Sequence, residues 1–138
     1  MSRVLALDIG TKRTGVAVTD ELKIIASGLT TIDTKSLFKW LQNYLSNEKV
    51  EIFVVGEPKQ LNNLASESAN FINEIVKKLQ QTFPKISMVR VDERFTSKIA
   101  FQSMIDGGLK KKQRQNKALI DEVSATLILQ SYLEQHGK

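Results

Sequence analysis

Three strand-like runs follow one another at the start of the chain, with no helical pattern between them, and this order limits the possible folds most strongly. Arg3–Ile9 is almost entirely apolar, Thr14–Thr19 is rich in β-branched residues, and Lys23–Ile32 has the composition of a third strand. The connection Gly-Thr-Lys-Arg after the first run is short, as in a tight reversal. The three runs therefore predict an antiparallel meander.

The period of the apolar residues then changes. Leu37, Leu41 and Leu45 recur at helical spacing, with Thr34 as the expected N-cap. The later segments are a strand at Glu51–Val55, a helix over Phe71–Leu79, a strand at Ile86–Val91, a helix from about Ser97 to Gly107, and a last helix that carries Leu119 to Leu133. Alternating strands and helices after a meander predict a mixed five-stranded sheet with two parallel steps, flanked by helices. This is the ribonuclease H architecture, in one domain over residues 1–138, because no linker or change of composition divides the chain.

Composition excludes several kinds of chemistry. The chain has no cysteine, which excludes a thiol nucleophile and a thiolate zinc site. Its one histidine is His136 near the end, so a multi-histidine metal site is improbable. The longest uncharged stretch, Val123–Leu133, is well short of the ~20 residues that span a bilayer, and the start lacks the apolar core of a signal peptide. These features predict a soluble, cytoplasmic protein with no membrane contact. The net charge of +5 permits a polyanionic partner without requiring one.

Asp8 is the most informative single residue. It lies inside the first apolar run, where a buried carboxylate is costly unless it is paired, hydrogen-bonded or bound to a metal ion. A structural ion pair with Lys12 or Arg13 is the alternative to a functional role. We favour the functional role, because few charges lie deep in a strand for structural reasons alone.

Acids from two further segments are expected to approach Asp8. Asp92 and Glu93 end the fifth strand, whose carboxyl end lies near Asp8 if the two strands are parallel; a solvated strand end paired with Arg94 is the alternative. Asp121 is expected to open the last helix, in a row with Ala125 that faces the core, although a first-turn acid also suits the helix dipole.

Together these acids predict an oxygen-ligand site for Mg²⁺ or Mn²⁺. Two ions bridged by Asp8 would activate a water molecule and stabilise the leaving oxygen in phosphodiester cleavage. Metal-activated water is the most economical hydrolytic mechanism for a chain with no usable histidine or cysteine.

A basic segment precedes the last helix. Five of the 20 lysines and arginines lie within eight positions, namely Lys110, Lys111, Lys112, Arg114 and Lys117. The segment begins after two glycines and has no apolar periodicity, so we expect a mobile loop that contacts phosphates above the acidic site; a solvated charge run is the alternative. Lys12, Arg13 and Arg94, which flank the acids, are assigned to the same nucleic-acid surface. Phe38 and Trp40 are assigned to helix packing rather than to base stacking.

One phosphate-loop spacing is incomplete. Gly10 to Gly15 has the G-x₄-G spacing, but Val16 follows where the motif requires lysine, and a strand follows where it requires a helix.

Four segments resemble motifs of the YqgF family, also called RuvX. They occur in the same order as in the family, and the chain has the family's length. They are LALDIGTKRTGVAVTD, VVGEP, VDERFTS and DEVSATLILQSYL. Members of this family are described as Holliday junction resolvases or as pre-16S rRNA nucleases. The resemblance implies a ribonuclease H-like fold and a cytoplasmic bacterial nuclease that depends on a metal ion and matures the 5′ end of 16S rRNA.

The resemblance also implies the site residues. It places the acidic triad at Asp8, Glu93 and Asp121, with Gly10 completing the first motif. The chain departs from the family at Glu57, where many members have an apolar residue, and in the run Lys59–Asn63, where a D-G turn is common. Glu57 either adds a fourth carboxylate or pairs with Lys59.

Three functions compete at this point. The first is a nuclease acting on pre-16S rRNA or branched DNA. The second is a non-catalytic factor that binds nucleic acid or ribosomal particles. The third is a phosphotransferase, because LALDIGT also resembles the phosphate-binding turn of sugar kinases and actin-like ATPases, but that class needs two such domains. The chain is expected to be a monomer or a homodimer, and a junction resolvase requires the dimer.

Overall fold

A five-stranded mixed sheet forms the centre of the protein. The computed structural model describes residues 2–57, 67–92 and 117–136. The strands lie in the order β3-β2-β1-β4-β5; β1, β2 and β3 are antiparallel neighbours, and β1, β4 and β5 are parallel neighbours. The elements are β1 (Arg3–Ile9), β2 (Arg13–Thr19), β3 (Ala26–Asp33), the 3₁₀ turn η1 (Thr34–Ser36), α1 (Leu37–Asn47), β4 (Val50–Glu57), α2 (Glu67–Thr82), β5 (Ser87–Asp92) and α5 (Lys117–His136). The predicted meander and the two parallel steps are confirmed.

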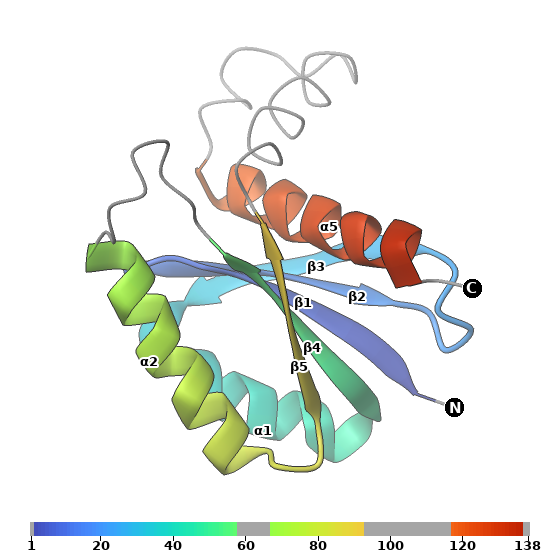
Figure 1. The fold of residues 1–138 in the computed structure, drawn as a ribbon, viewed down its shortest axis with the longest axis horizontal. Helices are drawn as coiled ribbons and strands as arrows, with labels where there is room; N and C mark the ends of the chain where they lie inside the picture. The colour runs from blue at the N-terminus through green and yellow to red at the C-terminus, as the bar shows by residue number, and fades with distance from the viewer. Residues whose placement is uncertain (1, 58–66, 93–116, 137–138) are drawn as a thin grey trace.

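Helices cover both faces of the sheet. In Figure 1, α1 and α2 lie below the sheet and α5 crosses above it. Alternate residues of β1 point to opposite faces. Leu5, Leu7 and Ile9 belong to the cluster formed with α1 and α2, whereas Val4 and Ala6 belong to the cluster formed with α5. The apolar run of β1 is therefore buried on both sides, as in the parallel part of a sheet.

The aromatic residues of α1 confirm their predicted packing role. Phe38 and Trp40 pack against the core beneath the sheet. The ring of Trp40 stacks on that of Tyr44, with centroids 5.1 Å apart.

Several element boundaries differ from those expected. The third strand begins at Ala26 rather than Lys23, because Asp20 Oδ1 accepts hydrogen bonds from the Ile24 and Ile25 amides and holds the preceding residues in a turn. Strand β4 continues through Gly56 to Glu57, since its ladder with β5 persists to the last pair. The expected helix from Ser97 lies outside the described residues.

Helix α5 approaches the edge strand β3 closely at Gly28. A Cβ atom at this position would lie 2.7 Å from Glu122 Oε1 and 3.0 Å from Thr126 Oγ1. Thr126 in turn donates to the Glu122 carbonyl at 2.9 Å. Glycine at position 28 therefore allows the amino-terminal half of α5 to rest on the sheet.

Replacing Gly28 by valine is expected to destabilise the protein by about 1–3 kcal/mol, because the branched side chain would overlap Glu122 and Thr126. Alanine at the same position is expected to cost less, since a single methyl group displaces mainly the flexible Glu122 side chain. Urea denaturation of both variants measures the difference. Valine and alanine variants that are both as stable as the wild type would show that the approach of α5 is not tight.

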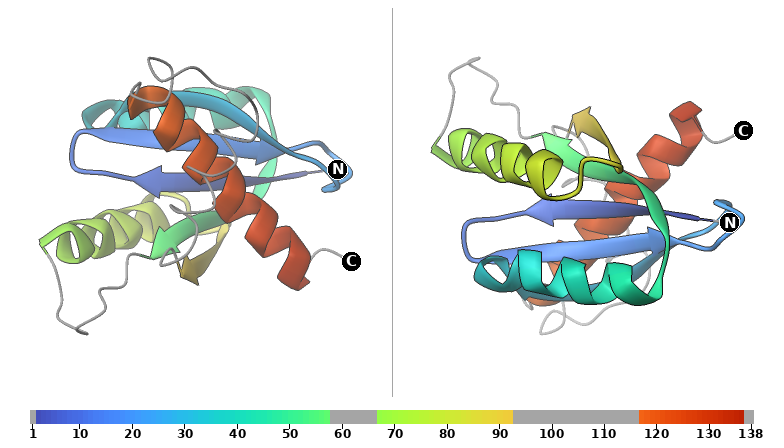
Figure 2. Two further views of the ribbon diagram at one scale, coloured as in Figure 1. Left: turned by 90° about the horizontal axis from the view of Figure 1, so that it is seen from above. Right: turned by 90° about the horizontal axis from the view of Figure 1, so that it is seen from below.

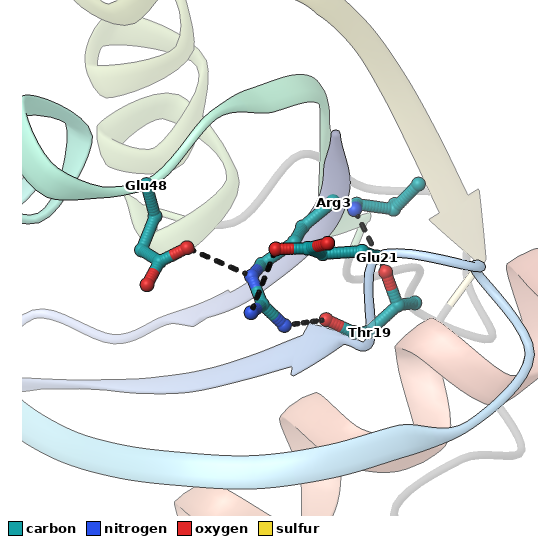
Figure 3. A network of polar contacts seen from close by, with 5 residues as sticks. Arg3, Thr19, Glu21 and Glu48 are labelled. Atoms are coloured by element: carbon teal, nitrogen blue, oxygen red, sulfur yellow. Dashed lines mark hydrogen bonds and ion pairs between the residues drawn. The ribbon is translucent and has the colours of Figure 1, made fainter. Parts of the chain in front are cut away.

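A polar network fixes the amino end of β1, which is opposite to the end that carries Asp8 (Figure 3). Arg3 donates to the Thr19 carbonyl at 2.9 Å and to Glu48 Oε2 at 3.2 Å, and forms an ion pair with Glu21. The hydrogen bond from Arg3 to Glu48 raises the pKa of the guanidinium above its ordinary value. Thr19 Oγ1 accepts from the Val4 amide at 2.9 Å.

No helix in the described ranges is long and apolar enough to cross a membrane.

Candidate functional site

Asp8 lies one residue before the carboxyl end of β1 and is half-buried. Val4 and Ala6 pack beneath α5, so strand alternation places Asp8 on the same face of the sheet as these residues. The acid therefore belongs to the face that α5 covers, and not to the larger apolar cluster on the other side.

Glycines flank Asp8 on both neighbouring strands. Gly15 of β2 is its direct partner in the ladder, and Gly56 of β4 follows Val55, the partner of Leu7. Ala17 and Val54 pack on the α5 face, so Gly15 and Gly56 share that face by alternation. Neither neighbour places a side chain beside the Asp8 carboxylate, a feature that sequence reasoning missed and that only the strand register reveals.

The carboxyl ends of β1, β4 and β5 point to the same edge of the sheet, toward the side on which α5 begins (Figure 2). Glu57 and Asp92 form the last pair of the β4–β5 ladder. Because β4 separates β1 from β5, their backbones are two strand spacings apart, about 9–10 Å. The expected approach of the fifth strand to Asp8 is thus confirmed for the backbone, with one strand between them.

The other two acids of the predicted triad are described less fully. Glu93 lies outside the described residues. Asp121 does not open the last helix as expected: α5 begins at Lys117, so Asp121 is its fifth residue and the first turn contains no acid. The segment Lys117–Ile120 contains good helix formers and extends the helix by one turn. A first-turn dipole role for Asp121 is therefore wrong.

Asp121 precedes Ala125 by one helical turn. Ala125 is fully buried in the cluster that includes Ala6 of β1. Helix α5 thus packs over the strand that carries Asp8 and brings the backbone of its second turn to the same side of the sheet. The described side chains include no group of three or more acidic, histidine or cysteine residues placed to hold a metal ion.

Two of the predicted nucleic-acid contacts lie in the turn that follows β1. Lys12 is exposed and Arg13, the first residue of β2, is half-buried. Arg94, Lys110, Lys111, Lys112 and Arg114 lie outside the described residues. Lys117 belongs to the first turn of α5, so its expected placement in a loop is wrong, while its contact with nucleic acid stays a prediction.

The turn after β1 is attached to Thr34, the first residue of η1. Thr34 Oγ1 donates to the Gly10 carbonyl at 2.7 Å, and the Thr34 amide donates to the Lys12 carbonyl at 3.0 Å. The expected N-cap role of Thr34 is therefore wrong: Ser36 occupies the N-cap position of α1, without a side-chain capping bond. The Thr34 hydroxyl bonds to a carbonyl 24 residues away instead.

A polar depression lies at the amino edge of the sheet and is a poor candidate for a nucleic-acid site. It has a volume of about 460 Å³ and is lined by Arg3, Glu21, Asn47, Glu48 and Lys49. Arg3, its half-buried cation, is already bonded to carboxylates of the protein. The carboxyl edge therefore remains the candidate active site.

The fold and the acid at its carboxyl edge define a protein of the ribonuclease H-like class. The solved structure of Thermus thermophilus RuvC in complex with a Holliday junction substrate superposes with a TM-score of 0.59, at 18% identity, over 99% of this chain and 97% of that one. The sequence profile of the RuvX family, described as Holliday junction resolvase, matches residues 2–135. The chain belongs to the RuvX family, also called YqgF.

Close relatives carry a more specific name. A protein of Christiangramia forsetii named "Putative pre-16S rRNA nuclease" is 63% identical over 133 residues, which cover 96% of this chain and 98% of that protein. A protein of Flavobacterium johnsoniae with the same name is 60% identical over 96% of each chain. The family resemblance inferred from the four motifs is confirmed.

Proposed function

We propose that this protein is a metal-dependent nuclease that hydrolyses phosphodiester bonds, with pre-16S rRNA as its substrate. The observation that carries the proposal is Asp8, a half-buried acid on the α5 face with glycines on both neighbouring strands. The oxygens of a carboxylate are the donors that Mg²⁺ and Mn²⁺ prefer in proteins. The names of the close relatives supply the substrate class.

Asp8, Glu93 and Asp121 form the proposed catalytic triad. Asp8 is carried by β1, Glu93 follows β5, and Asp121 lies in the second turn of α5. The resemblance of the segment VDERFTS to the family motif assigns this position to Glu93 rather than to Asp92.

The donor chemistry of these residues suits a divalent cation. All three are carboxylates, which bind Mg²⁺ or Mn²⁺ in preference to Zn²⁺, and the glycines beside Asp8 add no competing side chain. When bound, such a cation would lower the pKa of a water molecule and stabilise charge on the leaving oxygen.

In the net reaction, water adds across one P–O bond and leaves a phosphate monoester and a hydroxyl group. Asp8, Glu93 and Asp121 would hold the cation. The basic residues would bind the backbone phosphates and orient the strand. Glu57, at the end of β4, remains a candidate fourth carboxylate.

A Holliday junction resolvase is the second candidate function, because the family profile has that description. Purified protein with Mn²⁺ would be given end-labelled precursor 16S rRNA and a four-way DNA junction in parallel. Cleavage of the RNA near its mature 5′ end supports the proposal, and paired symmetrical cuts in the junction alone would replace it by the resolvase. Binding without cleavage of either substrate would support the non-catalytic factor.

A pre-16S rRNA substrate implies a cytoplasmic protein, and the resolvase reaction would require a homodimer.

The basic segment Lys110–Lys117 yields a separate prediction. Replacing Lys110, Lys111, Lys112 and Arg114 by glutamine is expected to weaken binding to all sequences alike, because phosphate contacts carry no sequence information. Each lost contact should flatten the slope of log K against log salt concentration by about 0.7–0.9. Fluorescence anisotropy of labelled RNA over a salt series measures the slope.

Four exposed lysines supply a matched control with the same change of charge. They are Lys39 of α1, Lys77 and Lys78 of α2, and Lys85 before β5. Glutamine at these four positions should leave the slope close to that of the wild type. Equal slopes for the two quadruple variants would show that the basic segment is a solvated charge run.

A further inference from the structure

The turn between β1 and β2 is held by a directed chain of two buried hydroxyl groups. Thr14 and Thr34 have 0% and 7% of their surface exposed, and their Oγ1 atoms lie 2.9 Å apart. A threonine hydroxyl has one proton, and Thr34 donates it to the Gly10 carbonyl at 2.7 Å. Thr14 is therefore the donor to Thr34, and the chain runs from Thr14 through Thr34 to Gly10.

Two carbonyl groups of the turn point toward Thr34 as a result. The Gly10 carbonyl accepts from the Thr34 hydroxyl, and the Lys12 carbonyl accepts from the Thr34 amide at 3.0 Å. The Arg13 carbonyl accepts from the Gly10 amide at 2.9 Å, which closes the turn on itself. These acceptors, which would repel an anion, are engaged within the protein, while the Lys12 side chain is exposed.

Gly10 itself is required by this closure. A Cβ atom at position 10 would lie 2.8 Å from the Arg13 carbonyl oxygen, a backbone atom that has no freedom to move aside. The turn begins two residues after Asp8 and is continuous with its strand. Its position relative to the acid is thus fixed from both sides, by β1 and by Thr34.

We propose that Thr34 is a positioning residue that holds the Gly10–Arg13 turn as a phosphate clamp, so that Lys12 binds a backbone phosphate of the nucleic acid beside Asp8. The inference rests on the proposed nuclease function and adds to it a residue that touches neither substrate nor metal. Thr34 acts through the turn, and Lys12 makes the contact. Gly10–Gly15, which has the spacing of a phosphate loop but no helix after it, would then bind phosphate because the buried Thr34 makes the turn rigid.

The test compares two threonine-to-valine replacements. Thr34→Val removes the hydroxyl that bonds Gly10, whereas Thr19→Val removes a hydroxyl that is 1% exposed and accepts from Val4 at the opposite end of β1. Both leave a buried polar group without its partner, so both are expected to lower stability. Thr34→Ser keeps the hydroxyl and is the rescue variant.

Binding is measured first, in EDTA, by anisotropy of labelled precursor RNA over a salt series. Thr34→Val is expected to flatten the salt slope by one phosphate contact, about 0.7–0.9, as Lys12→Gln does. The double variant should be no flatter than either single one, because both remove the same contact. Thr34→Ser and Thr19→Val should keep the wild-type slope.

Cleavage is measured next, with Mn²⁺. Thr34→Val is expected to lower kcat/KM by about 10–100-fold, the scale of a phosphate misplaced by about 1 Å, and Thr34→Ser to restore it. Thr19→Val should keep the wild-type kcat/KM at a temperature where all variants are folded.

Three results would overturn the inference: equal behaviour of the two valine variants, a wild-type salt slope in Lys12→Gln, or reduced cleavage by Thr34→Val with an unchanged slope. Lys12 is exposed, so a wild-type salt slope in its glutamine variant overturns the inference even where Thr34→Val fails to fold. The binding arm needs no cleavage. A wild-type protein that binds but cuts neither substrate would therefore refute the proposed function and leave the clamp to be judged on its own.

Discussion

Replacing Asp8 by asparagine is expected to remove nuclease activity and leave the fold intact. Asparagine has nearly the same shape as aspartate but no charge, so it cannot bind a divalent cation with comparable strength. We expect the rate of RNA cleavage to fall to less than about one thousandth of the wild-type rate. Thermal denaturation of the metal-free protein should give an equal or higher midpoint, because a half-buried charge has been removed.

Asp20 provides a matched control for this substitution. It follows the last residue of β2, and because β1 and β2 are antiparallel it lies beside the amino end of β1, opposite to the end that carries Asp8. The hydrogen bonds that its carboxylate accepts from the Ile25 and Ile24 amides lower its pKa, and the carbonyl oxygen of asparagine is able to accept the same bonds. Asp20→Asn should therefore retain activity. Full activity of Asp8→Asn, in a preparation free of contaminating nuclease, would refute the assignment of the site.

The order of strands and helices was predictable because it depends on short-range periodicity. The apolar run Arg3–Ile9 is buried on both faces, and the change to helical spacing after Asp33 coincides with the start of η1 and α1. Strand ends were less predictable. Gly56 suggested a stop, but a strand continues for as long as its neighbour supplies backbone partners, and β5 does so through Asp92.

The third strand illustrates a local bond that overrides composition. Ile24 and Ile25 have the composition of a strand, yet they lie in the turn that Asp20 organises, with 68% and 62% of their surfaces exposed. Lys23 in the same turn has a φ of 60°, a left-handed conformation that ends any extended run. A propensity read from residue types does not register either effect.

The candidate site also combines features that were predictable from the sequence with features that were not. A carboxylate within an apolar strand was visible in the sequence, and so was its approach to the end of a parallel strand. The flanking glycines and the role of Thr34 were not, because they depend on register and on contacts between residues far apart in the chain. Thr34 precedes a helix and so resembles an N-cap, whereas its hydroxyl bonds Gly10 across 24 positions.

Removing divalent metal is expected to abolish cleavage as completely as Asp8→Asn does. Treatment with EDTA should stop the reaction, and Mg²⁺ or Mn²⁺ should restore it, because carboxylate oxygens prefer these ions. Zn²⁺ should restore it poorly, since it prefers nitrogen and sulfur donors that this chain, with one histidine and no cysteine, hardly offers.

The affinity for the ion is expected to depend on pH in one direction. Acidic ligands bind a cation only when they are deprotonated, so affinity should fall as the pH is lowered through the range in which the carboxylates take up protons. Titration calorimetry with Mn²⁺ at several pH values measures this affinity, with Asp20→Asn as the variant that keeps binding and Asp8→Asn as the one that loses it.

Cleavage that continues unchanged in EDTA would contradict the metal requirement, and Mn²⁺ binding that is equal in the two variants would show that Asp8 is not a ligand. The two measurements are independent, because one follows the reaction and the other follows the ion, and only their agreement assigns the carboxyl edge of β1 as the site of both.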